Sequence, residues 1–537
     1  MKKLLAKLCA MLLIIALAVP GISVSAAEGG SLAGKTIILH TNDVHGAIEG
    51  YTYIRGLKSK FEKAGAEVIL VDAGDFSQGT TYVSAYKGSS AVKMMNKALY
   101  NYATLGNHEF DYGYARLKSN MKKANFKVLC ANVLNSKGKT VFDANAVYTT
   151  KSGVKIGFFG INTPESQTKA NPTLIKGLTF LGGQDMYDCA QEQVKALEGS
   201  DVIICLSHLG VDKESEPNTS YDLAKNTTGI DMIIDGHSHT VMTKGPNGEK
   251  IQSTGTAFAN IGVIVISDAD KKIVDNYLLS VNDLTKVLIP TSKSVTKKAQ
   301  SYIDRINTLY GTVFAKSEVE LNGAKAPGNR TEETNNGDLI TDSMIWKVMQ
   351  NKDGLTVDED HVVAITNGGG IRAAIAAGDV TRNNVKTVLP FGNTITVVYV
   401  KGSALLNALE ASCQSCPEAI GGFPQVAGMK ITIDTTKAYK ANAETYPGST
   451  YYGPKKVTRV TIDSINGKAF NADDTYAVIT NDFCAGGGDT YYEFGVAATK
   501  FDTGVPLDEA LMEYIVDELG GVIGTQYEKP QGRITIK

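Results

Sequence analysis

The first half of the chain alternates between short apolar runs and longer stretches of mixed polarity. From residue 35 to about residue 281, each run is rich in Ile and Val and ends in a cluster of Gly, Asp, Asn or His. Stretches 90–99 and 186–197, which lie between the runs, are helix-like. An alternation of strands and helices predicts a layered α/β domain. The strand-like runs are 36–39, 67–71, 154–159, 202–206 and 232–234.

The pattern changes near residue 291. Residues 294–310 are polar, with Ile303, Ile306 and Leu309 at helical spacing, and they predict a helix that joins two domains. We therefore expect an N-terminal α/β domain at 33–290, a linker helix at 291–320 and a C-terminal α/β domain at 325–537. The elements predicted in the C-terminal domain are a loop at 325–329, helices at 338–349 and 403–412, and strands at 362–366, 430–433, 457–462 and 476–480.

The N-terminus has the layout of a secretory signal peptide. Lys2, Lys3 and Lys7 precede an apolar stretch at residues 8–19, and small residues follow it. We place cleavage after Ala26, which predicts a signal peptide at residues 1–26 and a secreted or periplasmic mature protein. An uncleaved anchor is the alternative, but the apolar stretch is shorter than the roughly 20 residues that a membrane span needs. We therefore expect no stable membrane anchor after cleavage.

Composition excludes several classes of protein. The chain has 537 residues, of which 43% are hydrophobic and 20% charged, as in an ordinary soluble globular protein. Its net charge of −2 argues against a protein that coats nucleic acid or a polybasic membrane surface binder. Cys413 and Cys416 have the spacing of a redox site or half a zinc site, but a local disulfide or two plain thiols is the favoured interpretation.

Histidines are concentrated just after the strand-like runs. Five of the seven lie in short polar clusters there, and a further cluster supplies carboxylates. In open α/β sheets, ligands bind beyond the carboxyl ends of strands, so we expect these side chains to gather at one edge. His40 and His361 fit strand or strand-edge positions, and we expect them to be structural. The clusters are 42–46, 72–75, 106–109, 207–209 and 236–239.

The gathered side chains predict a metal site. Asp43 and His45, like His237 and His239, are two residues apart, which places both side chains on one face of a strand. Mixed imidazole and carboxylate ligands suit borderline divalent ions such as Zn²⁺ or Mn²⁺. Seven candidate ligands are too many for one tetrahedral ion, but they fit two ions bridged by a carboxylate. Two metals about 3.5–4 Å apart can hold the attacking and leaving oxygens of a phosphoryl transfer.

The second half carries glycine, arginine and phenylalanine motifs in predicted loops. The three glycines between Asn367 and Arg372 let a ligand approach the backbone, although a plain glycine-rich turn is an equal expectation. Arg330 and Arg372 could each bind a phosphate, which matches the guanidinium fork, or could simply be solvated. Phe391 and Phe483 could stack on both faces of a nucleobase, or could be ordinary core residues.

Together, the ordered motifs resemble the calcineurin-like metallophosphoesterase signature. With the motifs of the second half, the chain is similar to the exported 5′-nucleotidase family, which includes UDP-sugar hydrolases. The resemblance covers nearly all of the mature chain. It is carried by Leu39-His-Thr-Asn-Asp-Val-His-Gly46, Gly74-Asp75, Gly106-Asn-His-Glu-Phe-Asp111, His208, Gly236-His-Ser-His239, Thr334-Asn-Asn-Gly-Asp-Leu339, Asn367-Gly-Gly-Gly-Ile-Arg372, Leu389-Pro-Phe-Gly-Asn393 and Asn481-Asp-Phe-Cys-Ala-Gly-Gly-Gly-Asp489.

The resemblance implies two divalent metal ions, most readily Zn²⁺ or Mn²⁺, with Asp75 as the bridge. One ion would be held by Asp43, His45, Asp75 and His239, and the other by Asp75, Asn107, His208 and His237. The family often has Gln or Asn where this chain has His239, and this departure could shift the metal preference. His108 and Asp111 resemble the catalytic pair of the family, in which the histidine stabilises the transferring phosphoryl group or protonates the leaving oxygen.

The resemblance also makes the C-terminal domain the substrate-binding domain. Phe391 and Phe483 would sandwich the base, and Asp489 would accept hydrogen bonds from the ribose hydroxyls. Of the other residues, the arginines would bind phosphate and the asparagines would contact the base or nearby groups. A large rotation of the domains about the linker helix is implied as well. The residues carried over for substrate binding are Arg330, Asn367, Arg372, Phe391, Asn393, Phe483 and Asp489.

These inferences predict a two-metal hydrolase that converts nucleoside 5′-phosphates to nucleosides and phosphate outside the cytoplasm. A 2′,3′-cyclic phosphodiesterase with 3′-nucleotidase activity, or a UDP-sugar or dinucleotide pyrophosphatase, is the alternative on the same fold. Asp111 favours the 5′-nucleotidase branch, because the cyclic phosphodiesterases tend to have Asn there. A nucleotide-binding protein that has lost catalysis is a third hypothesis. No nucleic-acid partner is expected, and the metal, the base preference and the oligomeric state stay open.

Overall fold

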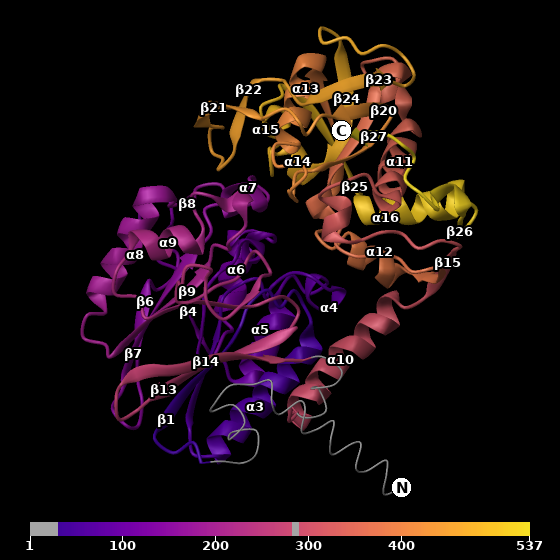
Figure 1. Cartoon of the computed structure of the whole chain (residues 1–537). Helices are drawn as coiled ribbons and strands as arrows, with labels where there is room; N and C mark the ends of the chain where they lie inside the picture. The colour runs from indigo at the N-terminus through magenta and orange to yellow at the C-terminus, as the bar shows by residue number, and fades with distance from the viewer. Residues whose placement is uncertain (1–30, 282–288) are drawn as a thin grey trace, which may run out of the picture.

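The structure, a computed structural model, describes residues 31–281 and 289–537. The signal peptide predicted at residues 1–26 lies outside these described residues. Figure 1 shows two α/β domains one above the other, with helix α10 (Lys293–Tyr310) running from the lower domain to the upper one. Among the helices within the described ranges, none combines the length and the hydropathy that crossing a membrane requires.

The N-terminal domain is built on two six-stranded sheets. In spatial order, the first contains β14 (Lys272–Ser280), β13 (Asn260–Ser267), β1 (Lys35–Thr41), β2 (Glu67–Asp72), β3 (Tyr102–Ala103) and β4 (Lys127–Val128). The second contains β11 (Val241–Met242), β12 (Ile251–Thr254), β10 (Met232–Ile234), β9 (Val202–His208), β7 (Lys155–Asn162) and β6 (Asn145–Thr149). The neighbours β1 and β2 are parallel, as are β7, β9 and β10. The carboxyl ends of these strands therefore meet at one edge of each sheet.

Apolar side chains fill the space on both faces of the two sheets. Ile38 and Ile204 belong to a buried cluster between the sheets. Helices α3 (Tyr51–Lys63) and α5 (Ser89–Ala98) cover the other face of the first sheet, and α8 (Gly183–Ala196) covers that of the second. Strands covered on both sides read as continuous apolar runs, which confirms the five predicted strands and the layered α/β fold.

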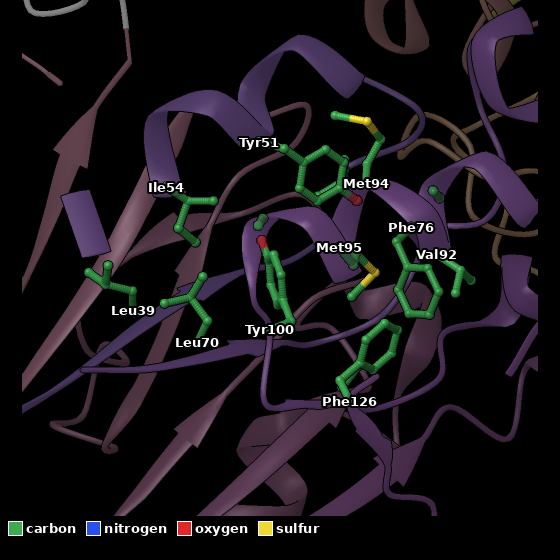
Figure 2. Close-up of a cluster of buried hydrophobic side chains, with 14 of the residues drawn as sticks. Leu39, Tyr51, Ile54, Leu70, Phe76, Val92, Met94, Met95, Tyr100 and Phe126 are labelled. Carbon is green, nitrogen blue, oxygen red and sulfur yellow. The ribbon is translucent and has the colours of Figure 1, made fainter. Parts of the chain in front are cut away.

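The helix-facing core also anchors a loop that carries candidate chemistry. Figure 2 shows this core, with Leu39 of β1 near Ile54 of α3 and Phe76 near Phe126. The rings of Phe76 and Phe126 pack edge to face, with their centroids 6.2 Å apart. Because Phe76 is fully buried, the loop that begins after β2 cannot move without disturbing the core. Asp75 is held in place in this way.

Helix α10 belongs to the core of the N-terminal domain before it reaches the second domain. Val295 and Ala299 on its first turns are buried against α3 and α5. The helix ends at its C-cap, Gly311, and strand β15 (Val313–Ser317) then pairs within a sheet of the C-terminal domain. The helix is therefore shorter than the linker expected at 291–320, whose last residues take part in a sheet.

The C-terminal domain is built on a five-stranded mixed sheet. Its spatial order is β19 (Pro424–Ala427), β16 (Val362–Asn367), β24 (Thr475–Asn481), β18 (Thr394–Lys401) and β25 (Thr499–Pro506). Helices α11 (Asn335–Met349) and α16 (Leu507–Glu513) pack on one face, and α13 (Gly402–Ser412) packs on the other. Two three-stranded sheets complete the domain: β17 (Gly378–Thr381), β15 and β26 (Val522–Ile523), and β23 (Val460–Ile465), β20 (Met429–Ile433) and β27 (Ile534–Ile536).

Two element boundaries differ from the sequence-based expectation because a side chain binds the backbone there. Helix α11 begins at Asn335 rather than 338, since the Thr334 hydroxyl accepts a hydrogen bond from the backbone of the first turn. Strand β23 begins at Val460 rather than 457, since the Glu410 carboxylate accepts hydrogen bonds from the backbone N–H groups of residues 458–460. The contact of Thr334 is local, three residues along the chain, whereas those of Glu410 join residues about 50 positions apart and leave no periodic signal in the sequence.

Candidate active site

Loops at the carboxyl ends of five strands bring seven polar side chains together. Asp43 and His208 are fully buried and Asp75 is 2% exposed, so these side chains face the protein interior. Three overlapping groups of histidines and carboxylates there have their ligand atoms within 4.8 Å of one another. The seven residues are Asp43 and His45 after β1, Asp75 after β2, Asn107 after β3, His208 at the end of β9, and His237 and His239 after β10.

The backbone of this site is strained. Five of the seven residues have φ in the left-handed region, which non-glycine residues rarely adopt. Strain of this kind persists only where surrounding contacts impose it, and it is concentrated at functional sites. One such contact is the carboxylate of Asp43, which accepts a hydrogen bond from the backbone N–H of His237 at 3.0 Å. The five residues are Asp43 (49°), His45 (45°), Asp75 (61°), His237 (76°) and His239 (57°).

The first group of ligand atoms is formed by Asp43, His45 and His239. The Nε2 atoms of His45 and His239 lie 3.1 Å apart. Oδ1 of Asp43 lies 3.5 Å from Nε2 of His239 and 3.8 Å from Nε2 of His45. Oδ2 of Asp75 is also 3.8 Å from Nε2 of His45. Two imidazoles and two carboxylates thus converge on one point.

The second group is formed by Asp75, His208 and His237, with Asn107 beside them. Nδ1 of His208 donates to the backbone oxygen of Ala73 at 2.6 Å, which leaves Nε2 directed at Oδ2 of Asp75, 3.1 Å away. Nδ1 of His237 lies 2.9 Å from Oδ1 of Asn107. Asp75 therefore contributes to both groups, as a bridging ligand would.

These atoms fit divalent metal ions. Nε2 of His208 is buried and has no hydrogen-bond partner among the described residues, although it lies among carboxylate oxygens. Burial holds the pKa of His45 and of His239 well below the usual value, so both rings are neutral and can donate a lone pair. Neutral imidazoles mixed with carboxylates are the ligand set of borderline divalent ions.

Glu109 supports the site and was not among the residues expected from the sequence. Its carboxylate accepts hydrogen bonds from the backbone N–H groups of Asp75, Phe76, Ser77 and Gly106, at 2.6–3.0 Å. One buried carboxylate thus holds the loop after β2 against the loop after β3. The sequence contains a signal for it, because Glu109 is the last residue of the Gly106-Asn-His-Glu109 motif.

Glu165 is a second supporting residue that sequence reasoning missed. Its Oε2 lies 2.7 Å from Nε2 of His237, on the side of the ring away from Asn107. Burial disfavours a charge on Glu165, but Lys169 and His237 outweigh this effect and lower its pKa to about 2. A carboxylate in this place fixes the orientation of a ligating histidine. Glu165 follows β7, a predicted strand whose end carries neither a histidine nor a cluster of carboxylates in the sequence.

His108 and Asp111 form a hydrogen-bonded pair next to the metal-ligand groups. Nδ1 of His108 lies 2.7 Å from Oδ2 of Asp111, and the backbone N–H of His108 donates to Oδ1 of Asp75 at 2.9 Å. Burial disfavours a charged His108 ring, but Asp111 and Asp75 outweigh it and raise its pKa. The protonated ring is therefore favoured, and its Nε2 is free of Asp111.

A cavity of about 480 Å³ joins this site to the C-terminal domain. From the N-terminal domain it is lined by Asp75, Asn107, His108 and Asp111, among others. The seven substrate residues expected from the sequence all line the same cavity: Arg330, Asn367, Arg372, Phe391, Asn393, Phe483 and Asp489. The structure therefore brings the two sets of candidate residues to one place.

Two arginines place uncompensated positive charge in the cavity. Within the described part of the chain, neither Arg330 nor Arg372 forms an ion pair with a carboxylate at 4.0 Å or less. Burial, with Arg330 as a second cause, lowers the pKa of Arg372 to about 10. An anion bound between the two guanidinium groups would relieve this repulsion.

The two aromatic residues occupy different surroundings. The ring of Phe391 stacks on His108, with the centroids 5.7 Å apart and the planes 25° from parallel, and the Arg372 guanidinium lies 5.8 Å from the same ring. Phe483 lies against Gly488, where a Cβ would come within 2.4 Å of the ring. The base sandwich expected from Phe391 and Phe483 stays a prediction.

Asp489 has the contacts of a positioned hydrogen-bond acceptor. Its Oδ2 accepts a hydrogen bond from Nδ2 of Asn367 at 2.9 Å, and Nδ2 of Asn481 in turn donates to Oδ1 of Asn367 at 3.1 Å. Asp489 has a φ of 49°, a further strained residue in the cavity. This chain of amides fixes the carboxylate and leaves its other oxygen available.

Several candidate residues lie away from the site. His40 is fully buried within β1, as its structural interpretation requires. His361 lies just before β16, where it pairs with Asp360 and Asp474. Cys413 and Cys416 are both buried free thiols, one of the two states that the favoured interpretation left open. Burial raises the pKa of both thiols, which disfavours redox chemistry there.

Comparison with known families matches both domains. Residues 36–241 match the calcineurin-like phosphoesterase family, and residues 313–495 match the 5′-nucleotidase C-terminal domain family. The chain is 30% identical over 548 residues to the trifunctional nucleotide phosphoesterase protein YfkN of Bacillus subtilis (strain 168). That alignment covers 93% of this chain and 34% of the relative, so the chain spans about a third of that protein's length.

Other relatives match along most of their length. The 5′-nucleotidase of Homo sapiens is 28% identical over 521 residues, which cover 88% of this chain and 86% of that protein. The crystal structure of a 5′-nucleotidase precursor from Thermus thermophilus is 29% identical, covers 94% of this chain and 99% of that one, and superposes with a TM-score of 0.77. This similarity confirms the predicted two-domain fold. The chain therefore belongs to the 5′-nucleotidase family of metal-dependent phosphoesterases.

Proposed function

We propose that the protein hydrolyses nucleoside 5′-phosphates to nucleosides and inorganic phosphate, outside the cytoplasm. The observation that carries the proposal is the single cavity that contains metal-ligand groups on one side and unpaired arginines, aromatic rings and a positioned carboxylate on the other. This combination suits a ligand with a phosphate, a base and a hydroxylated sugar. The proposed export rests on the N-terminal residues, which resemble a secretory signal.

Two divalent ions are the proposed cofactors. Asp43, His45, Asp75 and His239 would hold one, and Asp75, Asn107, His208 and His237 would hold the other. When bound, such ions act as Lewis acids and neutralise charge on the phosphoryl oxygens. Zn²⁺ and Mn²⁺ are the best candidates, because imidazole and carboxylate ligands occur together in both groups.

His108 is the proposed general acid. The reaction breaks the bond between phosphorus and the 5′-oxygen, water supplies the oxygen that enters the phosphate, and the leaving oxygen takes a proton from His108. Asp111 holds Nδ1 of the ring and so directs Nε2 into the cavity. The raised pKa of His108 favours the protonated ring, as this role requires.

The C-terminal domain is proposed to hold the nucleotide. Arg330 and Arg372, the unpaired cations of the cavity, would bind the phosphate as it is transferred. Phe391 and Phe483 would stack on the base. Asp489 would accept hydrogen bonds from the ribose, and Asn367 and Asn393 would contact the base or nearby groups.

The first experiment compares four substrates before and after metal removal. Phosphate release is measured from a 5′-nucleotide, its 3′-isomer, a 2′,3′-cyclic nucleotide and a UDP-sugar, with chelator and then with Zn²⁺, Mn²⁺ or Mg²⁺ restored. We expect metal-dependent release that is greatest for the 5′-nucleotide. His108→Gln should reduce it by about 10²-fold or more, whereas His361→Gln, a control outside the cavity, should not.

The other outcomes separate the alternatives. The similarity to a relative named as a trifunctional nucleotide phosphoesterase favours broader phosphoester use as the second candidate function. A preference for the cyclic or 3′ substrate would support that candidate and contradict the assignment of the C-terminal domain. Nucleotide binding without turnover under any of the metals would contradict the hydrolase proposal and favour a binding protein.

A further inference from the structure

A short helix of the N-terminal domain contacts both halves of the cavity. This helix, α7 (Ser166–Lys169), follows its N-cap Glu165, whose carboxylate binds His237 of the metal-ligand groups. At its other end, the backbone oxygen of Thr168 accepts a hydrogen bond from the backbone N–H of Asp489 at 2.8 Å. Helix α7 therefore reaches from the metal-ligand groups to the carboxylate that we assign to the ribose.

Lys169, the last residue of α7, extends its side chain into the same region. The side chain is 12% exposed. Its Nζ pairs with the carboxylate of Glu214 and lies 3.9 Å from Oδ1 of Asp489. The ammonium group also lies 5.7 Å from the ring of Tyr451, whose hydroxyl donates to Glu214 at 2.9 Å. Contacts from both domains thus hold the ammonium group in one position.

The space in front of this ion pair is kept open by a glycine. A Cβ at Gly421 would lie 3.3 Å from both carboxylate oxygens of Asp489 and 3.3 Å from Nζ of Lys169. Gly421 and Lys169 both line the cavity. A small polar group of a ligand can therefore reach a carboxylate acceptor and an ammonium donor at the same time.

A vicinal diol matches this pair of partners. Each hydroxyl of a diol donates one hydrogen bond and accepts others, so it is best satisfied by one acceptor and one donor. Oδ2 of Asp489 is already engaged by Asn367, and its Oδ1 faces Lys169. Lys169 in turn favours the charged form of Asp489: burial raises the pKa of Asp489, and Lys169 is the strongest influence that opposes this rise.

We infer that Lys169 completes the ribose subsite from the N-terminal domain, and that with Asp489 it selects nucleotides with a free 2′,3′-diol. Asp489 accepts a hydrogen bond from one hydroxyl and Lys169 donates to the oxygen of the other. The inference rests on the proposed function, because it takes the nucleoside to lie at Asp489. It adds a specificity determinant that belongs to the domain with the metal-ligand groups.

The test compares substrates with and without the diol. Hydrolysis of a ribonucleoside 5′-phosphate, its 2′-deoxy and 2′,3′-dideoxy analogues, and p-nitrophenyl phosphate is measured on the metal-loaded enzyme. The variants are Lys169→Met, which removes the donor, Lys169→Gln, which keeps an N–H donor, and Lys176→Met, an exposed lysine of the same segment as control. Melting temperature is measured for each variant.

We expect Lys169→Met to raise the KM for the ribonucleotide about tenfold, the loss of one hydrogen bond to a charged group. Activity toward the dideoxy substrate and p-nitrophenyl phosphate should fall by a clearly smaller factor, which reflects only the contribution of Lys169 to the charge of Glu165 beside His237. Lys169→Gln should keep part of the preference for the diol, and Lys176→Met all of it. An unchanged ratio of ribonucleotide to dideoxynucleotide activity in the folded Lys169→Met variant would overturn the inference, as would an equal loss on all four substrates.

Binding of the unphosphorylated nucleosides separates this inference from the proposed function. Calorimetry of a ribonucleoside and its 2′,3′-dideoxy analogue needs no turnover. If the wild-type protein prefers the ribonucleoside and Lys169→Met does not, the inference stands even where 5′-nucleotides are not hydrolysed. If the wild-type protein hydrolyses 5′-nucleotides but binds the two nucleosides equally, the inference fails and the proposed function stands.

Discussion

Single side chains that are not themselves candidate ligands hold the loops that carry the metal-ligand groups. Glu109 is the main example, because one carboxylate accepts four backbone N–H groups from two different loops. Hydrogen bonds to a charged acceptor are roughly twice as strong as neutral ones, and in a buried place they are not weakened by water. The positions of Asp75 and Asn107 therefore depend on a residue that is not itself one of the seven candidate ligands.

Glu109→Gln should weaken metal binding about 10- to 100-fold, as the loss of an outer-shell partner usually does. The amide offers one acceptor oxygen in place of two and brings N–H donors to face the backbone donors. Titration of the metal-free variant with Zn²⁺ or Mn²⁺ in a calorimeter measures the change. Glu198→Gln, an exposed change in the same domain, is the control. Equal affinity of the two variants would contradict the role given to Glu109.

His40 makes the stability of the fold depend on pH, independently of the active site. Burial lowers its pKa to about 4, with a weaker opposing effect from Gln252. The unfolded chain takes up this proton near pH 6.5, while the folded chain does so only near pH 4. Stability from the neutral ring is thus present above pH 6.5 and is lost as the pH falls toward 4, by about 3 kcal/mol in all.

His40→Leu should remove this part of the pH dependence. Unfolding by urea is followed at several values between pH 7 and pH 4, with chelator present so that metal release does not contribute. As the pH is lowered from 7 to 4, we expect the free energy of unfolding of the wild-type protein to decrease more steeply than that of the variant. Parallel curves would show that His40 takes up its proton equally in both states.

At the scale of elements, the pairing of β1 with β13 depends on a large residue of one strand lying opposite a small residue of the other. His40 is opposite Gly262 in this antiparallel pair. A Cβ at Gly262 would lie 1.9 Å from Nε2 of His40, so the imidazole occupies the space that a side chain would take. The large residue on one strand requires the small one on its neighbour, and the pair belongs to the sheet that carries Asp43.

Gly262→Ala should therefore destabilise the fold by about 1–3 kcal/mol through overpacking. The same change in a His40→Ala background should cost much less, because the new methyl group fills the space left by the ring. A double-mutant cycle measured by urea unfolding gives the coupling, expected within about 0.5–3 kcal/mol. Gly199→Ala, where a Cβ meets no atom within 4 Å, is the control and should be neutral. A coupling of zero would contradict the packing argument.

Elements with a continuous apolar pattern were predictable from the sequence, and those that depend on distant contacts were not. Strands β1 and β9 are buried on both faces, so their apolar runs stand out. Their ends gave the metal-ligand candidates, because polar residues follow each run directly. Lys169 and Glu165 follow β7 in the same way, but their importance arises from His237 and Asp489, which are distant in sequence. No local pattern records such a contact.

At the scale of the whole molecule, two domains with separate cores share one site. The hydrophobic clusters of the two domains have no residue in common, and α10 is the long helix between them. The metal-ligand groups belong only to the N-terminal domain, whereas most residues assigned to the nucleotide belong to the C-terminal domain. A bound metal ion should therefore stabilise the N-terminal domain more than the C-terminal domain.

Calorimetric unfolding tests this separation. In chelator we expect two transitions, and addition of Mn²⁺ should raise the temperature of one of them only. A metal at about 100 times its Kd adds about 2.7 kcal/mol of stability to the state that binds it. Asp75→Asn should abolish the shift, since Asp75 belongs to the group with His208 and His237 and its Oδ2 also lies 3.8 Å from Nε2 of His45 in the other group. A single transition that moves as a whole with metal would show that the domains unfold together.

The left-handed backbone conformation at five of the candidate ligand residues also limits which amino acids can replace them. At His239, with a φ of 57°, a replacement must both offer a ligand atom and tolerate a conformation that β-branched residues avoid. Asn and Asp satisfy both conditions, since their short polar side chains accept this conformation more readily than most. The backbone conformation thus restricts the substitutions at this position independently of metal binding. A change of metal preference through this residue is therefore limited to a small set of side chains.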